Sequence, residues 1–268
     1  MRTPATRTLL LVLVALPIFL ALGCQTYYRT PGGPAPIGEM TAPTIAEKLR
    51  VQPESPMPAT LALVRVQGSN YYSRSVAGVR RGGVSIVSAD DLEVPEDVWS
   101  IQKWPMVRFA TRLSAIIIPD AKDEDPDAAM LALREGAATL HADILALYTI
   151  DTTFRVDDFS PGALGLVTLG LAPTKNAVVN ATASMAFVDV RTGFVYGTAE
   201  ASSHDDQIAN SWTSEDAVDQ CRRRVEREAL TAMLAEAEKC WAGIAAGRKT
   251  QVEATGLSET VAPPGNAK

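Results

Sequence analysis

Histidine and cysteine are scarce in this chain, which has two histidines and three cysteines among 268 residues. The sequence also lacks the signature spacings of serine hydrolases, zinc peptidases, phosphate-binding loops and dinucleotide-binding turns. Acids outnumber bases by 31 to 25, and the net charge of −6 is unlike that of nucleic-acid-binding proteins. These absences favour a binding or structural protein over an enzyme. We expect no catalytic residue, cofactor, metal or nucleic-acid partner.

One acidic stretch, Asp120–Asp127, is a candidate calcium loop because it holds five acids. A calcium loop that began at Asp123 would need a glycine at its sixth position and a glutamate at its twelfth. The sequence has Ala128 and Arg134 at those positions. We predict a helix start instead, with Asp125-Pro126 as the N-cap and the first helical residue.

The two histidines are weak candidates for a metal site. His204-Asp205-Asp206 could ligate a metal, but the adjoining residues offer no third nitrogen or sulfur ligand. We therefore predict a polar loop there. His141 follows a predicted helix, and we expect it to have a structural role.

The N-terminal residues have the layout of an export signal. Arg2 and Arg7 precede an apolar run, Leu9–Leu22, which is 14 residues long and contains Pro17. A helix needs about 20 apolar residues to cross a bilayer, so a permanent membrane span is not expected. A basic start, an apolar middle and a small residue at the end predict a signal peptide over residues 1–23.

The end of this run, Leu20-Ala21-Leu22-Gly23-Cys24, resembles the lipobox of bacterial lipoproteins. The resemblance implies that the thiol of Cys24 receives a diacylglycerol and that Cys24 becomes the mature N-terminus. The alternative is an ordinary signal peptide cut nearby, with Cys24 a plain thiol. Gln25 stands where an aspartate would suggest retention at the inner membrane. We therefore expect a lipid anchor at the periplasmic face of the cell outer membrane.

Both ends of the remaining chain have little apolar periodicity. Residues 24–58 contain seven prolines and three glycines, which predicts an extended tether that could span about 100 Å. Thr44 and Glu47 have the spacing of a capping box, which indicates a short helix to about Leu49. Residues 247–268 have glycine, threonine and two prolines, and we expect a disordered tail.

Between these ends, residues 59–246 show the pattern of one α/β domain. We expect a mixed β-sheet of about five strands, flanked by helices and including a long C-terminal hairpin. Extended segments are predicted at 61–66, 84–88, 107–118, 144–154, 178–190 and 194–202. Helices are predicted to begin at Pro95, Pro126 and Thr213. Residues 68–83 read as a loop.

The last predicted helix, from Thr213 to about Ala242, carries the other two cysteines. Cys221 and Cys240 are 19 residues apart, so they lie roughly 28 Å apart on one helix. A disulfide needs alpha carbons within about 7 Å, so the two cysteines should not pair within the chain. Buried thiols or a link to another chain are the two interpretations. Arg222-Arg223-Arg224 lies among glutamates, which predicts an ion-paired surface.

An insertion at residues 155–177 contains the apolar stretch Gly162–Ala172. Its 11 residues are too few for a spanning helix but enough for a tilted spanning strand. A strand of a membrane pore should alternate apolar and polar residues, whereas both alternating sets are apolar here. Three interpretations stay open: a loop folded over the domain core, a patch for a partner or membrane surface, and a pore hairpin.

The order of these segments resembles the periplasmic domain of the curli-secretion (CsgG-like) lipoprotein family. The similar features are Ala142-Asp143 before a core strand, the Val-Asp-x-x-Thr-Gly turn at Val188–Gly193 and the helix after the hairpin. The resemblance covers about residues 60–242. It implies a mixed sheet flanked by helices at the outer membrane, without enzymatic activity.

Together these observations predict a non-enzymatic, lipid-anchored cell-envelope lipoprotein, a periplasmic scaffold or accessory factor for envelope assembly with a protein partner. The alternatives are a subunit of an outer-membrane secretion channel and an envelope hydrolase. In the secretion channel of the similar family, the insertion after the core strand builds the pore.

Overall fold

The structure is a computed structural model that describes residues 33–35, 45–73, 76–87, 92, 95–121, 125–158, 173–210 and 214–259. The predicted lipid site at Cys24 and the apolar stretch Gly162–Ala172 lie outside the described residues.

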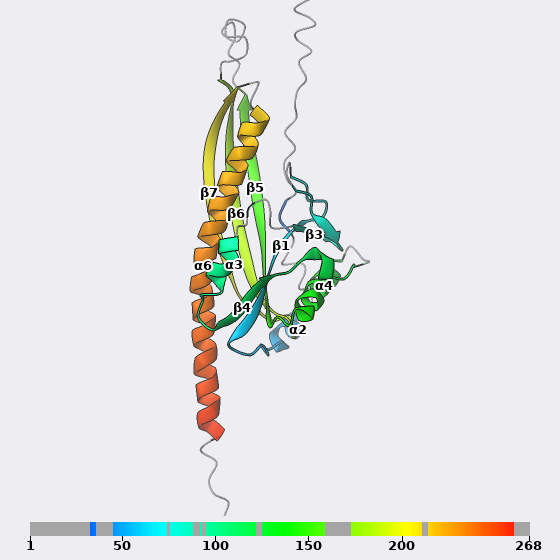
Figure 1. Cartoon of the computed structure of the whole chain (residues 1–268), viewed down its shortest axis with the longest axis vertical. Helices are drawn as coiled ribbons and strands as arrows, with labels where there is room; N and C mark the ends of the chain where they lie inside the picture. The colour runs from blue at the N-terminus through cyan, green and yellow to red at the C-terminus, as the bar shows by residue number, and fades with distance from the viewer. Residues whose placement is uncertain are drawn as a thin grey trace, which may run out of the picture.

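A mixed β-sheet forms the centre of the described chain (Figure 1). Its seven strands are β1 (Ala59–Gly68), β2 (Val79–Arg81), β3 (Val84–Val87), β4 (Val107–Arg112), β5 (Ile144–Asp158), β6 (Pro173–Asp189) and β7 (Val195–Asn210). The strand order is β2-β3-β1-β5-β6-β7, and β4 also pairs with β1. The pairs β1–β4 and β1–β5 are parallel, and all others are antiparallel. The predicted α/β class is confirmed, with more strands than the five expected.

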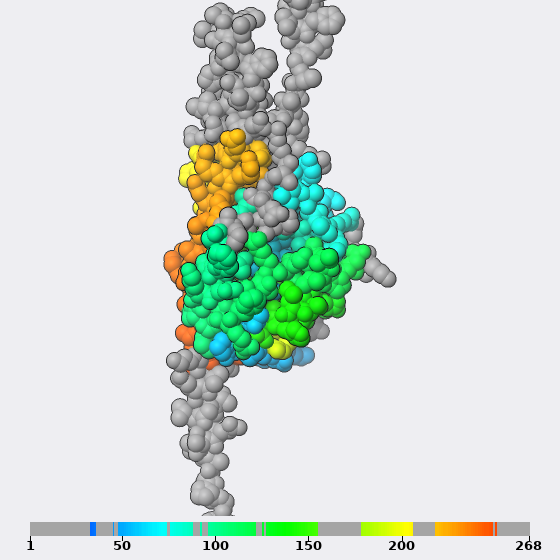
Figure 2. Space-filling view, in the orientation of Figure 1, coloured from blue at the N-terminus to red at the C-terminus, as the bar shows by residue number. Residues whose placement is uncertain are grey.

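Helices cover both faces of this sheet. The described helices are α2 (Ile45–Arg50), α3 (Pro95–Ile101), the 3-10 helix η3 (Ala115–Ile117), α4 (Pro126–Thr139) and α6 (Ser214–Glu259), and the described side chains of α2 are exposed. Helix α6 runs along the long strands on one face, and α4 lies on the other side of the sheet (Figure 1). In the space-filling view, α3 and β4, in teal to green, lie beside the bright green α4 on the visible face (Figure 2).

Strand β1 separates two hydrophobic cores. Leu61 and Leu63 belong to the core beneath α6, whereas Ala62 and Val64 belong to the core beneath α4. This alternation explains why the run is apolar throughout, since both of its faces are buried. Beneath α6, the ring of Phe187 packs against two tryptophans, with ring centroids 6.2 Å from Trp104 and 5.4 Å from Trp241.

The long hairpin and the last helix both exceed their predicted lengths. Strands β6 and β7 pair from Val188 and Val195 out to Pro173 and Asn210. Helix α6 has 46 residues, so it is about 69 Å long. It ends at Glu259. The predicted end at about Ala242 is therefore wrong, and so is the prediction that residues 247–259 belong to a disordered tail. Residues 243–259 contain no proline and are rich in good helix formers, which accounts for the continuation.

Two predicted segments differ in their local structure. Residues 68–83, read as a loop, include β2, which pairs with β3 through a turn where Gly82 has φ of +57°. The strand predicted over 107–118 ends at Arg112. Ser114 then caps η3, and the side chain of Ile116 is 86% exposed.

Candidate functional site

Asp143, which follows Ala142, and Asp189, in the turn Val188–Gly193, lie close together at one end of the sheet. The carboxylate of Asp189 is buried and accepts hydrogen bonds from five donors. These are the backbone N–H groups of Glu54 (2.9 Å), Ser55 (2.7 Å), Arg191 (2.9 Å) and Thr192 (3.1 Å) and the hydroxyl of Tyr196 (2.8 Å). Asp189 therefore joins the turn after β6 to the segment that precedes β1.

These contacts change two pKa values. Burial alone would raise the pKa of Asp189, but hydrogen bonds from Ser55, Tyr196 and backbone N–H groups together lower it below its usual range. Burial, followed by the bond to the Asp189 carboxylate, raises the pKa of Tyr196 to about 12. Asp189 is thus held as an anion and Tyr196 as a neutral donor at neutral pH.

Asp143 completes this arrangement, which we call the aspartate clamp (Asp143, Asp189, Ser55 and Tyr196). Its Oδ2 accepts a hydrogen bond from the backbone N–H of Thr60 at 2.9 Å, and its backbone carbonyl accepts the hydroxyl of Ser55 at 2.6 Å. The sequence indicated both aspartates, but only the structure brings them together. Their role in the described chain is to hold the residues just before β1 against the hairpin turn.

A second contact lies at the opposite end of β1. β5 pairs with β1 only as far as Val64, and Gly33–Ala35 pairs with the end of β1 beyond that point. The N–H of Gly68 donates to the carbonyl of Gly33 at 3.0 Å. The N–H of Ala35 donates to Oγ1 of Thr149 on β5 at 3.1 Å. The side chain of Ala35 is buried, so part of the predicted tether belongs to the folded body.

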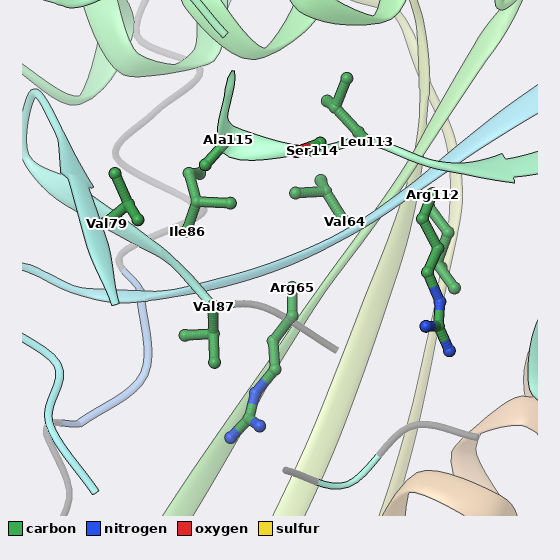
Figure 3. A pocket seen from close by; sticks show the side chains of 10 residues that line it. Val64, Arg65, Val79, Ile86, Val87, Arg112, Leu113, Ser114 and Ala115 are labelled. Atoms are coloured by element: carbon green, nitrogen blue, oxygen red, sulfur yellow. The ribbon is translucent and has the colours of Figure 1, made fainter. Parts of the chain in front are cut away.

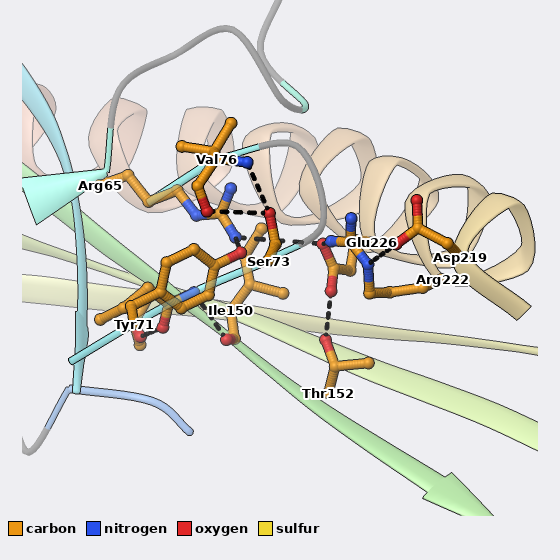
Figure 4. A network of polar contacts seen from close by, with 11 residues as sticks. Arg65, Tyr71, Ser73, Val76, Ile150, Thr152, Asp219, Arg222 and Glu226 are labelled. Atoms are coloured by element: carbon orange, nitrogen blue, oxygen red, sulfur yellow. Dashed lines mark hydrogen bonds and ion pairs between the residues drawn. The ribbon is translucent and has the colours of Figure 1, made fainter. Parts of the chain in front are cut away.

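Four charged side chains form a buried row between α6 and β1, which we call the charge ladder (Figure 4). Its members are Arg65, Glu226, Arg222 and Asp219, whose side chains are at most 6% exposed. Oε2 of Glu226 lies 2.7 Å from Nη1 of Arg222 and 4.0 Å from Nη2 of Arg65. Oδ1 of Asp219 lies 3.1 Å from Nε of Arg222. The charges alternate in sign, which offsets part of the cost of burying them.

The arginine triplet is therefore ion-paired, as predicted, but it is not all surface. Arg222 is fully buried, whereas Arg223 and Arg224 are exposed and pair with Asp219 and Asp205. Position 222 lies on the same helical face as Val218 and Val225, which are buried against the sheet. Helical spacing, rather than charge, carried the signal for this burial.

A slot opens between β3 and β4, where both strands leave β1 (Figure 3). Its volume is about 340 Å³, and its lining residues are Leu63, Val64, Arg65, Val79, Ile86, Val87, Arg112, Leu113, Ser114 and Ala115. Crevices at the carboxyl ends of strands are common ligand sites in α/β sheets, and the slot lies at the carboxyl end of β4. We take this slot as the candidate functional site.

The two ends of the slot differ in chemistry. Arg65 and Arg112 lie on one side of β1, and the apolar side chains Val64, Leu113 and Ala115 lie on the other (Figure 3). A guanidinium stays protonated in proteins and offers only donors, so it holds anions rather than transferring protons. The guanidinium groups on this side of the slot can therefore hold an anion.

The histidines of the sequence lie elsewhere. His204 lies on β7, so the polar loop predicted there is wrong, and the strand continues to Asn210. Its neighbour Asp205 forms an ion pair with Arg224. His141 follows α4, and its φ is +54°. No group of three potential metal ligands occurs among the described residues.

The structure confirms that Cys221 and Cys240 lie on one helix and that a helix starts at Asp125-Pro126. Cys221 is buried, Cys240 is half-buried, and both are free thiols on α6. Asp125 is the N-cap of α4, and its side chain accepts a hydrogen bond from the N–H of Asp127 at 3.0 Å.

Comparisons with known proteins add little. No protein-family model matches this chain, and no curated protein matches it. Among solved structures, the hypothetical protein CT253 from Chlamydia trachomatis is 12% identical with a TM-score of 0.28. That match covers 66% of this chain and 96% of the other. A likeness at this level carries no argument about function. Within the described residues, no helix combines the length and apolar character needed to cross a membrane.

Proposed function

We propose that this chain is a non-enzymatic, lipid-anchored lipoprotein of the cell envelope, held at the periplasmic face of the outer membrane. It acts as a scaffold or accessory factor for envelope assembly and works with a protein partner. The observation that carries the proposal is the run of apolar and small residues that ends at Cys24, together with the basic residues before it.

The docking of Gly33–Ala35 on β1 supports a short connection between the lipid and the body. Only nine residue steps separate Cys24 from Gly33, and a fully extended chain spans at most about 3.6 Å per residue. The attachment point on the body is therefore within about 30 Å of the lipid, rather than the 100 Å that a free tether would allow. A scaffold on so short a connection keeps a fixed end towards the bilayer.

The slot also supports binding rather than catalysis. Its polar lining consists of two guanidinium groups and the hydroxyl of Ser114, beside apolar walls. The hydroxyl of Ser114 accepts the N–H of Ile116 in the cap of η3. Such groups can hold an anion or a peptide segment in place.

Metabolic labelling with palmitate tests the proposal. The native chain should take up label and stay with the outer-membrane fraction, whereas Cys24→Ser should do neither. Cys240→Ser is the matched control, because it removes a thiol of the folded body and should label like the native chain. Equal labelling of the native chain and Cys24→Ser would overturn the proposal. Ring-shaped oligomers with Gly162–Ala172 protected from protease would favour the channel instead.

A further inference from the structure

The residues that line the slot between β3 and β4 lie on both faces of the sheet (Figure 3). On the α4 side, Val64, Ile86 and Leu113 are buried members of the hydrophobic core and form an apolar end. On the α6 side, Arg65 and Arg112 form a cationic end (Figure 3). A site with one apolar and one cationic end fits a molecule of the same polarity, with a hydrocarbon part and an anionic head.

Arg65 supplies the second observation. Its side chain is 2% exposed, yet its Nε has no hydrogen-bond partner within the described part of the chain. Its Nη2 donates to the hydroxyl of Tyr71 at 3.2 Å, and the guanidinium lies over the Tyr71 ring, 5.3 Å from the centroid. Buried polar atoms are usually hydrogen-bonded, so a buried donor without a partner, on a residue that lines the slot, points to a missing acceptor.

Glu226, which forms an ion pair with Arg65, does not supply that acceptor. Glu226 lies 4.0 Å from Arg65, beyond the range of a hydrogen bond. Its two oxygens are bound at 2.7 Å by Nη1 of Arg222 and by the hydroxyl of Thr152 (Figure 4). Glu226 is therefore shared by two arginines, so its negative charge only partly compensates the positive charge of Arg65. The remaining positive charge can attract an anionic ligand.

We propose that this slot binds a single-chain anionic amphiphile. Its carboxylate or phosphate head accepts hydrogen bonds from Arg65 and Arg112, and its hydrocarbon chain lies against Val64, Leu113 and Ala115. The head group can come from a free fatty acid or from a single-chain phospholipid, because both present an anion on one apolar chain. The proposal is independent of the lipid on Cys24.

Calorimetric titration of the Cys24→Ser chain, which cannot carry the lipid, tests the slot with decanoate, decyl phosphate and decanol. We expect saturable binding of at least one anion and binding of decanol that is weaker by about tenfold or more, because a hydrogen bond to a charged group contributes at least this factor. Tighter binding of decanoate indicates a fatty acid, and tighter binding of decyl phosphate indicates a phospholipid.

Variants locate the binding. Arg112→Gln should weaken the affinity for the anionic probes by about tenfold and leave the affinity for decanol unchanged. Arg108→Gln is the matched control, because Arg108 lies on the same strand outside the slot and should bind like the parent. Ala115→Phe should abolish binding of all three probes by filling the apolar end. Arg65→Lys keeps the charge that faces Glu226. It should weaken the binding of decanoate and decyl phosphate and leave the binding of decanol unchanged.

Circular dichroism establishes that each variant is folded before its affinity is compared. Absence of saturable binding at about 1 mM by the parent chain would overturn the proposal. Equal affinity for decanoate, decyl phosphate and decanol would overturn the role of the arginines, and full binding by folded Ala115→Phe would overturn the location. Failure of palmitate labelling at Cys24 would leave these results unaffected, so the two proposals are tested separately.

Discussion

Replacement of Asp189 by asparagine should destabilise the body severely. The five donors around the carboxylate divide between its oxygens, with Glu54, Ser55 and Tyr196 on Oδ2 and Arg191 and Thr192 on Oδ1. Asparagine keeps one acceptor oxygen and places an NH₂ group against the remaining donors. At least two hydrogen bonds to a charged acceptor are lost, at about 1.5–3 kcal/mol each, so unfolding becomes easier by about 3–6 kcal/mol.

Urea unfolding followed by tryptophan fluorescence measures this loss, because Trp104 and Trp241 are buried beside Phe187. A body of this size has a total stability of about 5–15 kcal/mol, so the shift is large. Asp205→Asn is the matched control: Asp205 pairs with Arg224 near the surface, and its loss should cost less than about 1 kcal/mol. A free energy of unfolding within about 1 kcal/mol of the parent for Asp189→Asn would refute the reasoning.

The same variant has a pH signature. The pKa of Asp189 is lowered in the folded state, so the folded state binds its proton less tightly than the unfolded state. Its contribution is fully present above the unfolded pKa of about 3.9 and is lost as pH falls through the lowered folded value. The stability gap between the parent and Asp189→Asn should therefore be constant near neutrality and shrink below about pH 4.

The remaining predictions concern α6 and the clamp. Glu226→Gln should cost about 3–5 kcal/mol in urea unfolding, and adding Arg222→Met should restore part of it; fully additive costs would contradict the ladder. Thiol labelling should modify Cys240, whose pKa burial raises, before the buried Cys221, and a peptide map showing a disulfide between them would contradict one continuous helix. The phenol of Tyr196 should titrate at about pH 12, and its stabilising contribution should be lost as pH rises from about 10 to 12; titration at 10 would contradict the clamp.

Local pattern predicted the elements whose signals are local. The N-cap and proline at Asp125-Pro126 start α4, and the turn between Asp189 and Val195, where Gly193 has a φ of +77°, joins β6 to β7. Helical spacing also carries the signal for the buried face of α6, which includes Val218, Val225 and Trp241. In each case the decisive residues lie within a few positions of one another, so the sequence alone carries the information.

The sites depend on contacts that periodicity does not reveal. Asp189 meets Ser55 across a separation of 134 residues, and Ala35 meets Thr149 across 114. The proline content of residues 24–58 indicated an extended chain, but it did not reveal that Gly33–Ala35 could pair with the free edge of β1. Arg222 shows a related limit: helical spacing places it on the buried face of α6, but only the structure shows Glu226 and Asp219 paired with it.

The slot had no sequence signal of its own. It exists because β3 is antiparallel to β1 and β4 is parallel to it, so both leave the same edge of β1 near Val64. Arg65 and Arg112 lie 47 residues apart in the chain and come together only through this pairing. A sequence pattern describes one strand at a time, whereas this site depends on three.

The measurement that tests the account most directly is the mass of the N-terminal peptide of the mature protein, isolated from cell envelopes. We expect a peptide that begins at Cys24 and carries a diacylglycerol, recovered with the outer membrane. A mature chain that begins at another residue, or at Cys24 without a lipid, and that fractionates away from membranes would contradict the central claim.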